Sequence, residues 1–484
     1  MKKNFFKVLI FMICSLPMLV IVSCSLPKGM KEADTLEQAT KFTYVPDSTQ
    51  SQVEVPVWRD FFHDSLLVSL IDTALKKNID LRVATQRIFQ AQSGMNFNRN
   101  AYFPDLNAVG SVGTTQYGQY TENGVGNFDT NKSPNITSEQ QIPNPVPDMF
   151  VGARTNWEIG FAGKLRNRKK AAYYKFLASQ NGKQFTQTQL VASVGRLYYE
   201  LLALDNQLKI IRKNLRLQER AMEIVEVQKQ GGQINELAVK QFRVQLLQSR
   251  SLEAGKIQQI VSIENNLNIL LGRYPQSIER ADTLLMTNEM ELLTTGLPAQ
   301  LIKNRPDIIE AEQQLHANEA QLKAVRASFF PSINLSGFLA FNSFNPTYFF
   351  NPASTAFQVS GVVTAPLLNR RGIMRDYWIQ GSEKNIAFLQ YQKMVYTGVG
   401  EVSTYYNRVL AFRQMSELKE QEVSELTLAT GIATDLFLTG YATYLEVLTV
   451  RRNVLEAEIQ LTDVRKEFYY AEIDLYKSLG GGWK

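Results

Sequence analysis

Two very long stretches without proline constrain this chain more than any other feature of its sequence. No proline occurs between Asp148 and Tyr274, and none follows Pro366. The first stretch carries apolar residues at alternating steps of four and three, namely Leu190, Val194, Leu197, Leu201, Leu204, Leu208, Ile211 and Leu215. This is the heptad seam of a helix that packs in a coiled coil. A helix over about 164–229 would be ~100 Å long at 1.5 Å per residue, which is longer than a compact globular domain needs.

A second long helix is predicted over about 372–439. Its shorter seam is Val395, Val399, Val402, Tyr406 and Val409. Shorter helices are predicted after the two long ones, at about 233–271 and 442–479, and before the strands, at about 66–100 and 307–328. Two short helices stacked end to end would match one long helix, and such an arrangement builds a wall of even height.

The chain carries an internal repeat. The segment Tyr102–Asn107 returns as Phe329–Asn334, with a proline at the same place in each copy. Gly232 lies 29 residues after Ala203, and Gly440 lies 29 residues after the matching Ala411 (232 − 203 and 440 − 411). Each copy reads helix, strand, loop, strand, long helix, glycine turn, helix. We therefore predict a duplicated fold.

Strand patterns lie between the short and the long helix of each copy. Apolar and polar residues alternate along about 151–161, 333–342 and 357–364, although Phe338 and Ala340 break the pattern. A first strand over about 106–120 alternates poorly. Alternation with an apolar outer face and a polar inner face is typical of transmembrane β-barrels, whose tilted strands need roughly 10 residues to cross a bilayer. The loops between the strands are rich in turn residues and are expected to be exposed.

Four strands are too few to close a barrel, and a sheet with open edges cannot sit in lipid. The sequence therefore predicts an oligomer. Three copies would supply twelve strands, which is wide enough for an aqueous lumen, but the composition also permits two or four copies.

The N-terminus reads as a secretory signal. Lys2 and Lys3 precede an almost wholly apolar run that ends in Ser23 and Cys24, so residues 1–23 are interpreted as a signal peptide. A transmembrane anchor is the alternative, but the run is short for a span and a polar stretch follows it. The residues Ile21–Cys24 resemble a bacterial lipoprotein signal. Cys24 would then be acylated and begin a lipidated extension over 24–57.

Composition excludes several classes of function. The formal net charge is +6, and removing the three lysines of the signal peptide leaves +3, which is too small and dispersed for nucleic-acid binding. The two cysteines, Cys14 and Cys24, permit no disulfide framework in the body of the chain. His63 and His316 have no second ligand nearby, and no catalytic constellation stands out. We expect no metal site, no cofactor and no enzymatic activity.

Several short motifs, in this order, resemble the TolC-like outer membrane factor family and its NodT-type efflux lipoprotein subgroup. They are Trp58–Phe62, Trp157–Gly160, Leu270–Pro275, Asn304–Ile308 and Leu475–Trp483. Each is weak alone, and the resemblance covers almost the whole mature chain.

The resemblance implies an α+β membrane protein. Its trimeric, 12-stranded transmembrane β-barrel, with four strands per subunit, continues into a long α-helical coiled-coil periplasmic tunnel. We expect a first efflux repeat over 58–275, a connector in the equatorial region over 276–296 and a second repeat over 297–484. The implied function is passive conduction of drugs, toxic compounds or metal ions across the outer membrane. The implied partners are a periplasmic adaptor, an inner-membrane pump of the RND type and outer-membrane lipid, with no nucleic acid.

The glycine turns are candidate functional elements. Gly231, Gly232 and Gly440 are expected to end the long helices at C′ and to permit sharp reversals, and the resemblance makes these turns an adaptor-docking tip or gate. The candidate tip residues are Gly231, Gly232, Gln233, Glu236, Gly440, Tyr441, Thr443 and Glu446. The family often has a carboxylate where this chain has Ala238, and many members have an Asp where it has Thr449. A strong anionic ring is therefore not expected.

Other interpretations remain open. Arg305-Pro306-Asp307 is read as a helix start, with proline at N1 and the carboxylate near the positive end of the dipole. A secretion exit duct or a stand-alone porin shares the predicted barrel and tunnel. A coiled-coil lipoprotein that tethers envelope layers is a third possibility, but a tether needs no barrel strands.

Overall fold

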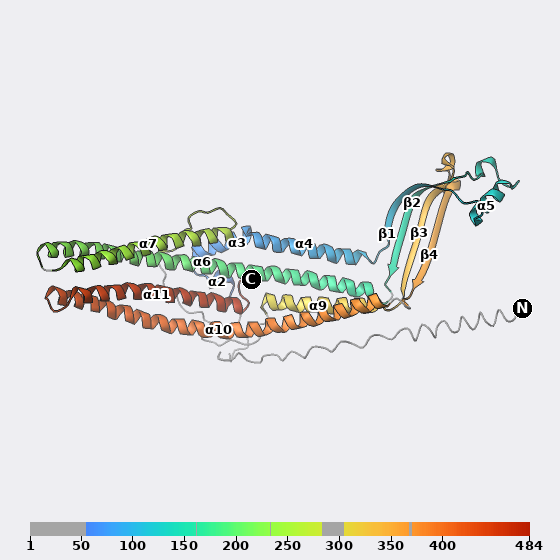
Figure 1. Cartoon of the computed structure of the whole chain (residues 1–484). Coiled ribbons are helices and arrows are strands. Elements are labelled where there is room, and N and C mark those ends of the chain that lie inside the picture. The colour runs from blue at the N-terminus through green and yellow to red at the C-terminus, as the bar shows by residue number, and fades with distance from the viewer. Residues whose placement is uncertain (1–54, 161, 233, 283–303, 367–369) are drawn as a thin grey trace. The chain divides into compact units, whose positions relative to one another are not determined.

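The computed structural model describes residues 55–160, 162–232, 234–282, 304–366 and 370–484 (Figure 1). The described residues form two units. The first comprises residues 91–176 and 314–387, and the second comprises residues 55–90, 177–313 and 388–484 apart from the gaps. The predicted signal peptide and Cys24 lie outside the described residues, as does 283–303 of the connector.

The first unit contains one antiparallel sheet, hydrogen-bonded in the order β1-β2-β3-β4. Its strands are β1 (Asp105–Thr115), β2 (Val146–Ile159), β3 (Ser332–Ser343) and β4 (Thr355–Thr364). Two strands per repeat were predicted, and both pairs are present. The first strand ends at Thr115 and not near Tyr120 as expected.

The register places the apolar residues of neighbouring strands on one face. Ala108 of β1 pairs with Ala153, Ala153 with Leu339, and Leu339 with Phe357. A second row joins Ile159, Ile333 and Val363, which pair in the same way. The opposite face carries polar pairs such as Asn107 with Arg154. The predicted alternation is therefore a property of the whole sheet, including β1.

The two residues that break the alternation lie on the polar face. Phe338 packs edge-to-face against Phe150 of β2, with ring centres 5.4 Å apart. The Arg154 guanidinium lies 4.8 Å from the Phe150 ring centre and 6.0 Å from that of Phe338. A cation over aromatic rings stabilises such a cluster. Ala340 is buried beside Gly152. A Cβ added to Gly152 would clash with the side chain and the backbone of Ala340.

The loop between β1 and β2 is more ordered than its turn residues predict. It contains α5 (Glu122–Asn131) and a 3-10 turn, Ser138–Gln140. The Asn123-Gly124 dipeptide lies inside α5, because the Thr121 hydroxyl caps the helix by accepting from the Gly124 N–H at 3.1 Å. The expected exposure of this loop is confirmed for α5, which has no buried residues.

The helices follow the predicted order. They are α2 (Trp58–Phe61), α3 (Ser65–Lys77), α4 (Ile79–Asn100), α6 (Lys164–Gln230), α7 (Glu236–Leu270), α9 (Pro306–Ala327), α10 (Arg371–Leu438) and α11 (Tyr444–Ser478). One prediction was wrong, since the single helix expected over 66–100 is broken at Asn78. The Asn78 side chain donates to the Leu270 carbonyl at 2.9 Å and accepts from the Leu81 N–H at 3.0 Å, which ends α3 and caps α4.

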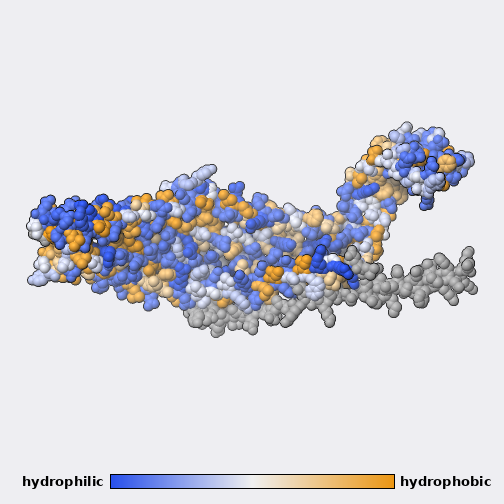
Figure 2. Space-filling model, viewed as in Figure 1, coloured by the Kyte–Doolittle hydropathy of each residue, from blue (hydrophilic) through white to orange (hydrophobic). Residues whose placement is uncertain are grey.

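The core of the second unit lies along the predicted heptad seam. Val194, Leu201 and Ile211 are fully buried, and so is Val402 of the second seam. Leu475, near the end of α11, packs in one cluster with Val194, Leu201 and Val402, whereas Ile211 packs in another with Leu215 and Leu455. Burying one such side chain stabilises the fold by about 1.5–3 kcal/mol. Hydrophobic residues also remain among hydrophilic ones on the visible surface of the long helices (Figure 2). No helix in the described part of the chain is long and apolar enough to cross a membrane.

Candidate functional site

The first tip turn joins α6 to α7. After Gln230 the Gly231 N–H donates to the Val227 carbonyl at 3.0 Å. Gly232 then takes a left-handed φ of 73°, which L-residues with a side chain adopt at a cost. Of these two glycines, Gly232 is the one whose backbone conformation disfavours a residue with a side chain. The Asn235 side chain caps α7 by accepting from the Ala238 N–H at 3.0 Å.

Glu236 lies in the first turn of α7 and is held by two lysines. Its carboxylate pairs with Lys229 at the end of α6 and, at 3.4 Å, with Lys240 one turn further along α7. Hydrogen bonds from Lys229 and then Lys240 lower the pKa of Glu236. A carboxylate at a helix N-terminus also complements the helix dipole. Glu236 therefore closes the first hairpin electrostatically.

The second tip turn joins α10 to α11. Gly440 has a φ of 82°, and the Leu436 carbonyl accepts from the N–H groups of Tyr441 and Ala442, at 2.8 and 3.1 Å. Both glycine turns thus end a long helix as predicted. The Tyr441 side chain is 85% exposed, so it is available to a partner.

A capping box follows at the start of α11. The Glu446 carboxylate accepts from the Thr443 N–H at 2.5 Å and from the Thr443 hydroxyl at 3.0 Å. These hydrogen bonds, the backbone one first, lower the pKa of Glu446. In a capping box the acid satisfies an N–H that the helix cannot. The sequence did not reveal this structural role of Glu446.

The two hairpins meet in a small hydrophobic cluster. Met222, Val225, Val239 and Phe242 of the first hairpin are buried, and Tyr444 and Leu448 of α11 pack against them. Ala238, where the family resemblance suggests a carboxylate, is fully buried. The structure therefore joins the two hairpins close to the turns that carry the predicted tip residues. Gln233 lies outside the described residues.

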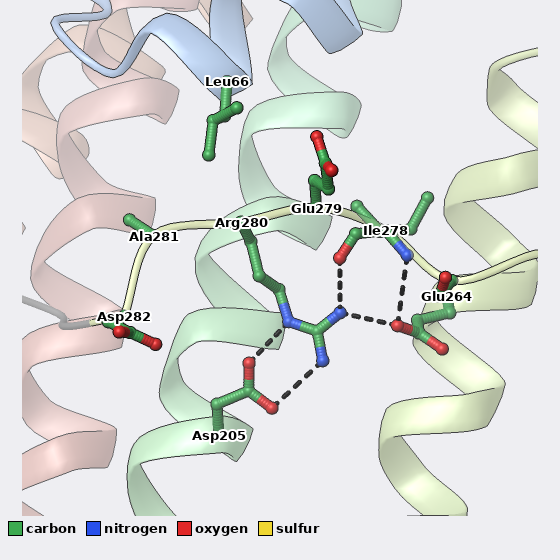
Figure 3. Close-up of a pocket in the computed structure, with 9 residues that line it drawn as sticks. Leu66, Asp205, Glu264, Ile278, Glu279, Arg280, Ala281 and Asp282 are labelled. Carbon is green, nitrogen blue, oxygen red and sulfur yellow. Dashed lines mark hydrogen bonds and ion pairs between the residues drawn. The ribbon is translucent and has the colours of Figure 1, made fainter.

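A charged pocket lies beside the described part of the connector (Figure 3). The Arg280 Nε and Nη2 atoms donate to both oxygens of Asp205 at 2.5 and 3.0 Å, while Nη1 lies 2.5 Å from a Glu264 oxygen. The Asp205 carboxylate and, after it, Glu264 raise the pKa of Arg280 against the effect of its burial. Arg280, Asp205 and Glu264 are all paired, so we interpret these contacts as holding the connector against α6 and α7. The sequence did not predict these ion pairs, because Arg280 is an isolated arginine in the connector.

A buried ion cluster lies at the start of α9. Pro306 is the first residue of this helix, as predicted. Arg305 donates to both oxygens of Asp307 at 3.1 and 2.8 Å, to Glu401 of α10 at 2.6 Å and to the Ser478 carbonyl of α11 at 3.3 Å. The motif predicted the helix start but not this junction of three helices.

His63 belongs to the second unit and His316 to the first. His316 contacts Glu319 at 3.4 Å, and its ring lies 5.2 Å from that of Tyr174. Among the described residues no group of three or more histidine, cysteine, aspartate and glutamate side chains could hold a metal ion.

The family model described as outer membrane efflux protein matches residues 70–273 and 297–481. The chain belongs to this family. Its members are channel proteins, and the predictions of an outer-membrane efflux channel subunit and of location in the outer membrane are confirmed. The recognition of a TolC-like outer membrane factor is confirmed with them.

Curated relatives match nearly the whole chain. The cation efflux system protein CusC of Escherichia coli K12 is 27% identical over 426 residues, which is 88% of each chain. The toluene efflux pump outer membrane protein TtgI of Pseudomonas putida is 26% identical over 478 residues, covering 97% of this chain and 98% of TtgI. The probable outer membrane lipoprotein SilC of Salmonella typhimurium is 27% identical over 426 residues, which is 88% of each chain.

Solved structures share the fold. Crystal structures of CusC match with a TM-score of 0.79 and 25% identity, covering 93% of this chain and 99% of theirs. The outer-membrane channel OprN matches with a TM-score of 0.81 and 22% identity, covering 95% of this chain and all of its own. The predicted fold class, a barrel sheet continued by long helices with internal duplication, is confirmed for this member of the outer membrane efflux protein family.

Proposed function

We propose that three copies of this chain close their sheets into a twelve-stranded barrel and their helices into a tunnel. The channel passively conducts small molecules that an inner-membrane pump delivers through a periplasmic adaptor. The observation that carries this proposal is the sheet, which has one apolar face and two edge strands, β1 and β4, without partners among the described residues. Unpaired backbone groups cost several kcal/mol each in lipid, so the edges must meet in a closed ring.

The partners follow from the family and from the names of the relatives. CusC is named for a cation efflux system and TtgI for a toluene efflux pump. We assign this chain to a pump assembly of the same general kind, with an RND-type pump and no catalysis of its own. This chain is almost equally similar to CusC and to TtgI, so the comparison does not choose between their cargoes. Drugs, toxic organic compounds and metal ions therefore all remain as classes of cargo.

Dye retention in living cells tests this function. A strain that lacks the chain should retain a small efflux dye, and a plasmid copy should restore export. Collapsing the proton gradient should stop export in the complemented strain, because the channel itself is passive. Equal dye retention with and without the chain would contradict the proposal. Dye passage that ignores the gradient would instead favour a stand-alone porin, and a secretion exit duct would export protein but no dye.

Acylation of Cys24 anchors the mature chain in this proposal. The motif Ile21–Cys24 and the lipoprotein name of SilC support it. Labelling with a fatty-acid analogue should be lost in Cys24→Ala and kept in Cys14→Ala, since residue 14 is removed with the signal peptide. Labelling of Cys24→Ala at the unchanged level would reject the anchor.

The two tip turns dock the adaptor. Tyr441 is highly exposed beside the second glycine turn, and it offers an aromatic contact of the kind enriched at protein interfaces. A crosslinkable cysteine at Tyr441 should capture the adaptor, whereas one at Gln390, an exposed position early in α10, should not. Equal capture at both positions would place docking elsewhere.

A further inference from the structure

The first turns of α6 carry a basic surface that channel function does not explain. Arg166, Lys169, Lys170 and Tyr173 are spaced as one side of a helix, and we call them the basic face. All four side chains are exposed, and Tyr173 is 46% exposed. The packed side of the same turns contains Ala171, which is 2% exposed.

The cations of the basic face lack carboxylate partners in the part of the chain that the structure describes. Lys169 lies 5.8 Å from the centre of the Tyr102 ring, and Lys170 lies 5.6 Å from that of Tyr174. These are contacts with aromatic rings and leave the N–H donors of both ammonium groups available.

Two exposed arginines further along α6 and α7 are different, because they are paired. Arg212 contacts Glu253 at 2.7 Å, and Arg250 contacts Glu219 at 3.1 Å. The cations at the start of α6 are therefore available to an anion from outside the described part of the chain.

The sheet shows to which side the basic face points. The Trp157 indole lies on the apolar face of the sheet and donates to the Tyr102 carbonyl at 2.9 Å. Lys169 contacts the ring of the same tyrosine. Lys164, by contrast, pairs at 2.8 Å with Glu158 of the polar face. The basic face thus lies on the lipid-facing side, and the lumen side of α6 begins with Lys164.

The depth of the basic face matches the headgroup region. Strand β2 ends at Ile159 and α6 begins at Lys164. At 1.5 Å per residue, Arg166 and Lys170 lie about 3 and 9 Å along the helix from its first residue. The polar region of one leaflet is roughly 5–8 Å thick, and the long stems of lysine and arginine extend their reach. Tyrosine and tryptophan gather at this same level in membrane proteins.

We propose that the basic face binds the headgroups of anionic phospholipids in the leaflet that meets this end of the barrel. Guanidinium and ammonium groups donate charge-assisted hydrogen bonds to phosphate oxygens, while Tyr173 and Tyr102 occupy the interface. The proposal depends on the placement of the sheet in the outer membrane and not on what the channel carries.

Native mass spectrometry of the full-length protein in detergent tests this binding. Phosphatidylglycerol and phosphatidylcholine are added in equal amounts, and the bound lipids are counted. The wild type should retain phosphatidylglycerol preferentially. The variant Arg166→Gln/Lys170→Gln should weaken this preference about tenfold or more, because each basic residue near an anionic surface adds to the attraction.

The matched control is Arg168→Gln/Lys175→Gln. Both residues are exposed, and helical spacing places them on the side of α6 that carries Lys164. This pair removes the same charge and should leave the lipid preference unchanged. An unchanged preference in Arg166→Gln/Lys170→Gln, or an equal loss in the control pair, would overturn the proposal. Displacement of phosphatidylglycerol by an equal concentration of inorganic phosphate would also overturn the proposal, since the site would then bind free phosphate as well as it binds the lipid. Dye export should persist in both variants, so failure of this test leaves the proposed efflux function standing.

Discussion

Glu446 accepts hydrogen bonds from both the N–H and the hydroxyl of Thr443, at 2.5 and 3.0 Å. This candidate gate residue is therefore occupied in shaping the turn that carries Tyr441. If the tip turns form a gate that an adaptor opens, as proposed, the contacts that close it must be weak enough for modest adaptor binding to break. Any gating effect of Glu446 would act through the order of its hairpin.

Removing the polar side chains of the second tip should open the channel. We predict that Tyr441→Ala/Thr443→Ala/Glu446→Ala raises single-channel conductance in planar bilayers, because capping and surface contacts are lost together. Glu446→Gln alone should change conductance less, since glutamine can also complete a capping box. A triple variant with an intact oligomer and wild-type conductance would place the gate elsewhere.

Gly440 is predicted to be intolerant of alanine. A Cβ there meets nothing within 4 Å, so the penalty comes from its φ of 82° and amounts to about 1–2 kcal/mol. Hydrogen exchange of the amides around the turn should accelerate in Gly440→Ala. The control is Gly400→Ala inside α10, where space is equally open and the backbone is helical, so exchange there should be unchanged or slower. Identical exchange at the tip in Gly440→Ala and the wild type would refute this view of the turn.

Arg305 should be among the most sensitive positions of the second unit. Its removal leaves Asp307, with 6% of its side chain exposed, buried and unpaired, at a cost of about 3–5 kcal/mol. Thermal unfolding of Arg305→Ala should therefore begin at a clearly lower temperature. Arg375→Ala breaks an exposed pair with Asp376, which is worth about 0–1 kcal/mol. Equal melting of the two variants would show that the buried cluster contributes little.

The first tip should loosen in acid. The lysines beside Glu236 lower its folded pKa below the usual value of 4.5. A lowered carboxyl pKa contributes stability above the unfolded value, and this contribution is lost as the pH falls through the folded value. We predict that the early amides of α7 exchange faster, after correction for intrinsic rates, as the pH falls below about 4.5. Glu236→Gln should remove this acid dependence, and its persistence in that variant would assign it to another group.

Much of the fold was predictable because its signals are local and periodic. The seam from Leu190 to Leu215 is set by heptad spacing, and its residues are buried except for Leu197, which is partly buried. The strands were predictable because apolar and polar residues alternate along them. The break at Asn78 was not, because it depends on a hydrogen bond to Leu270, distant in sequence. Helix α5 was missed because the cap at Thr121 outweighs a turn-forming dipeptide.

The candidate site was predictable in position but not in chemistry. Equal spacing in the two repeats located Gly232 and Gly440, and both take the left-handed conformation. The roles of Glu236 and Glu446 required the neighbours that only folding supplies. Arg305 shows the same limit, since its partner Glu401 lies 96 residues away along the chain.

The mass of the detergent-solubilised protein shows directly how many chains form the barrel. Each sheet has two edges, at β1 and β4, without partners in the described part of the chain, so we predict a particle with the mass of three mature chains after correction for bound detergent. A stable monomer that still conducts ions in planar bilayers would contradict it.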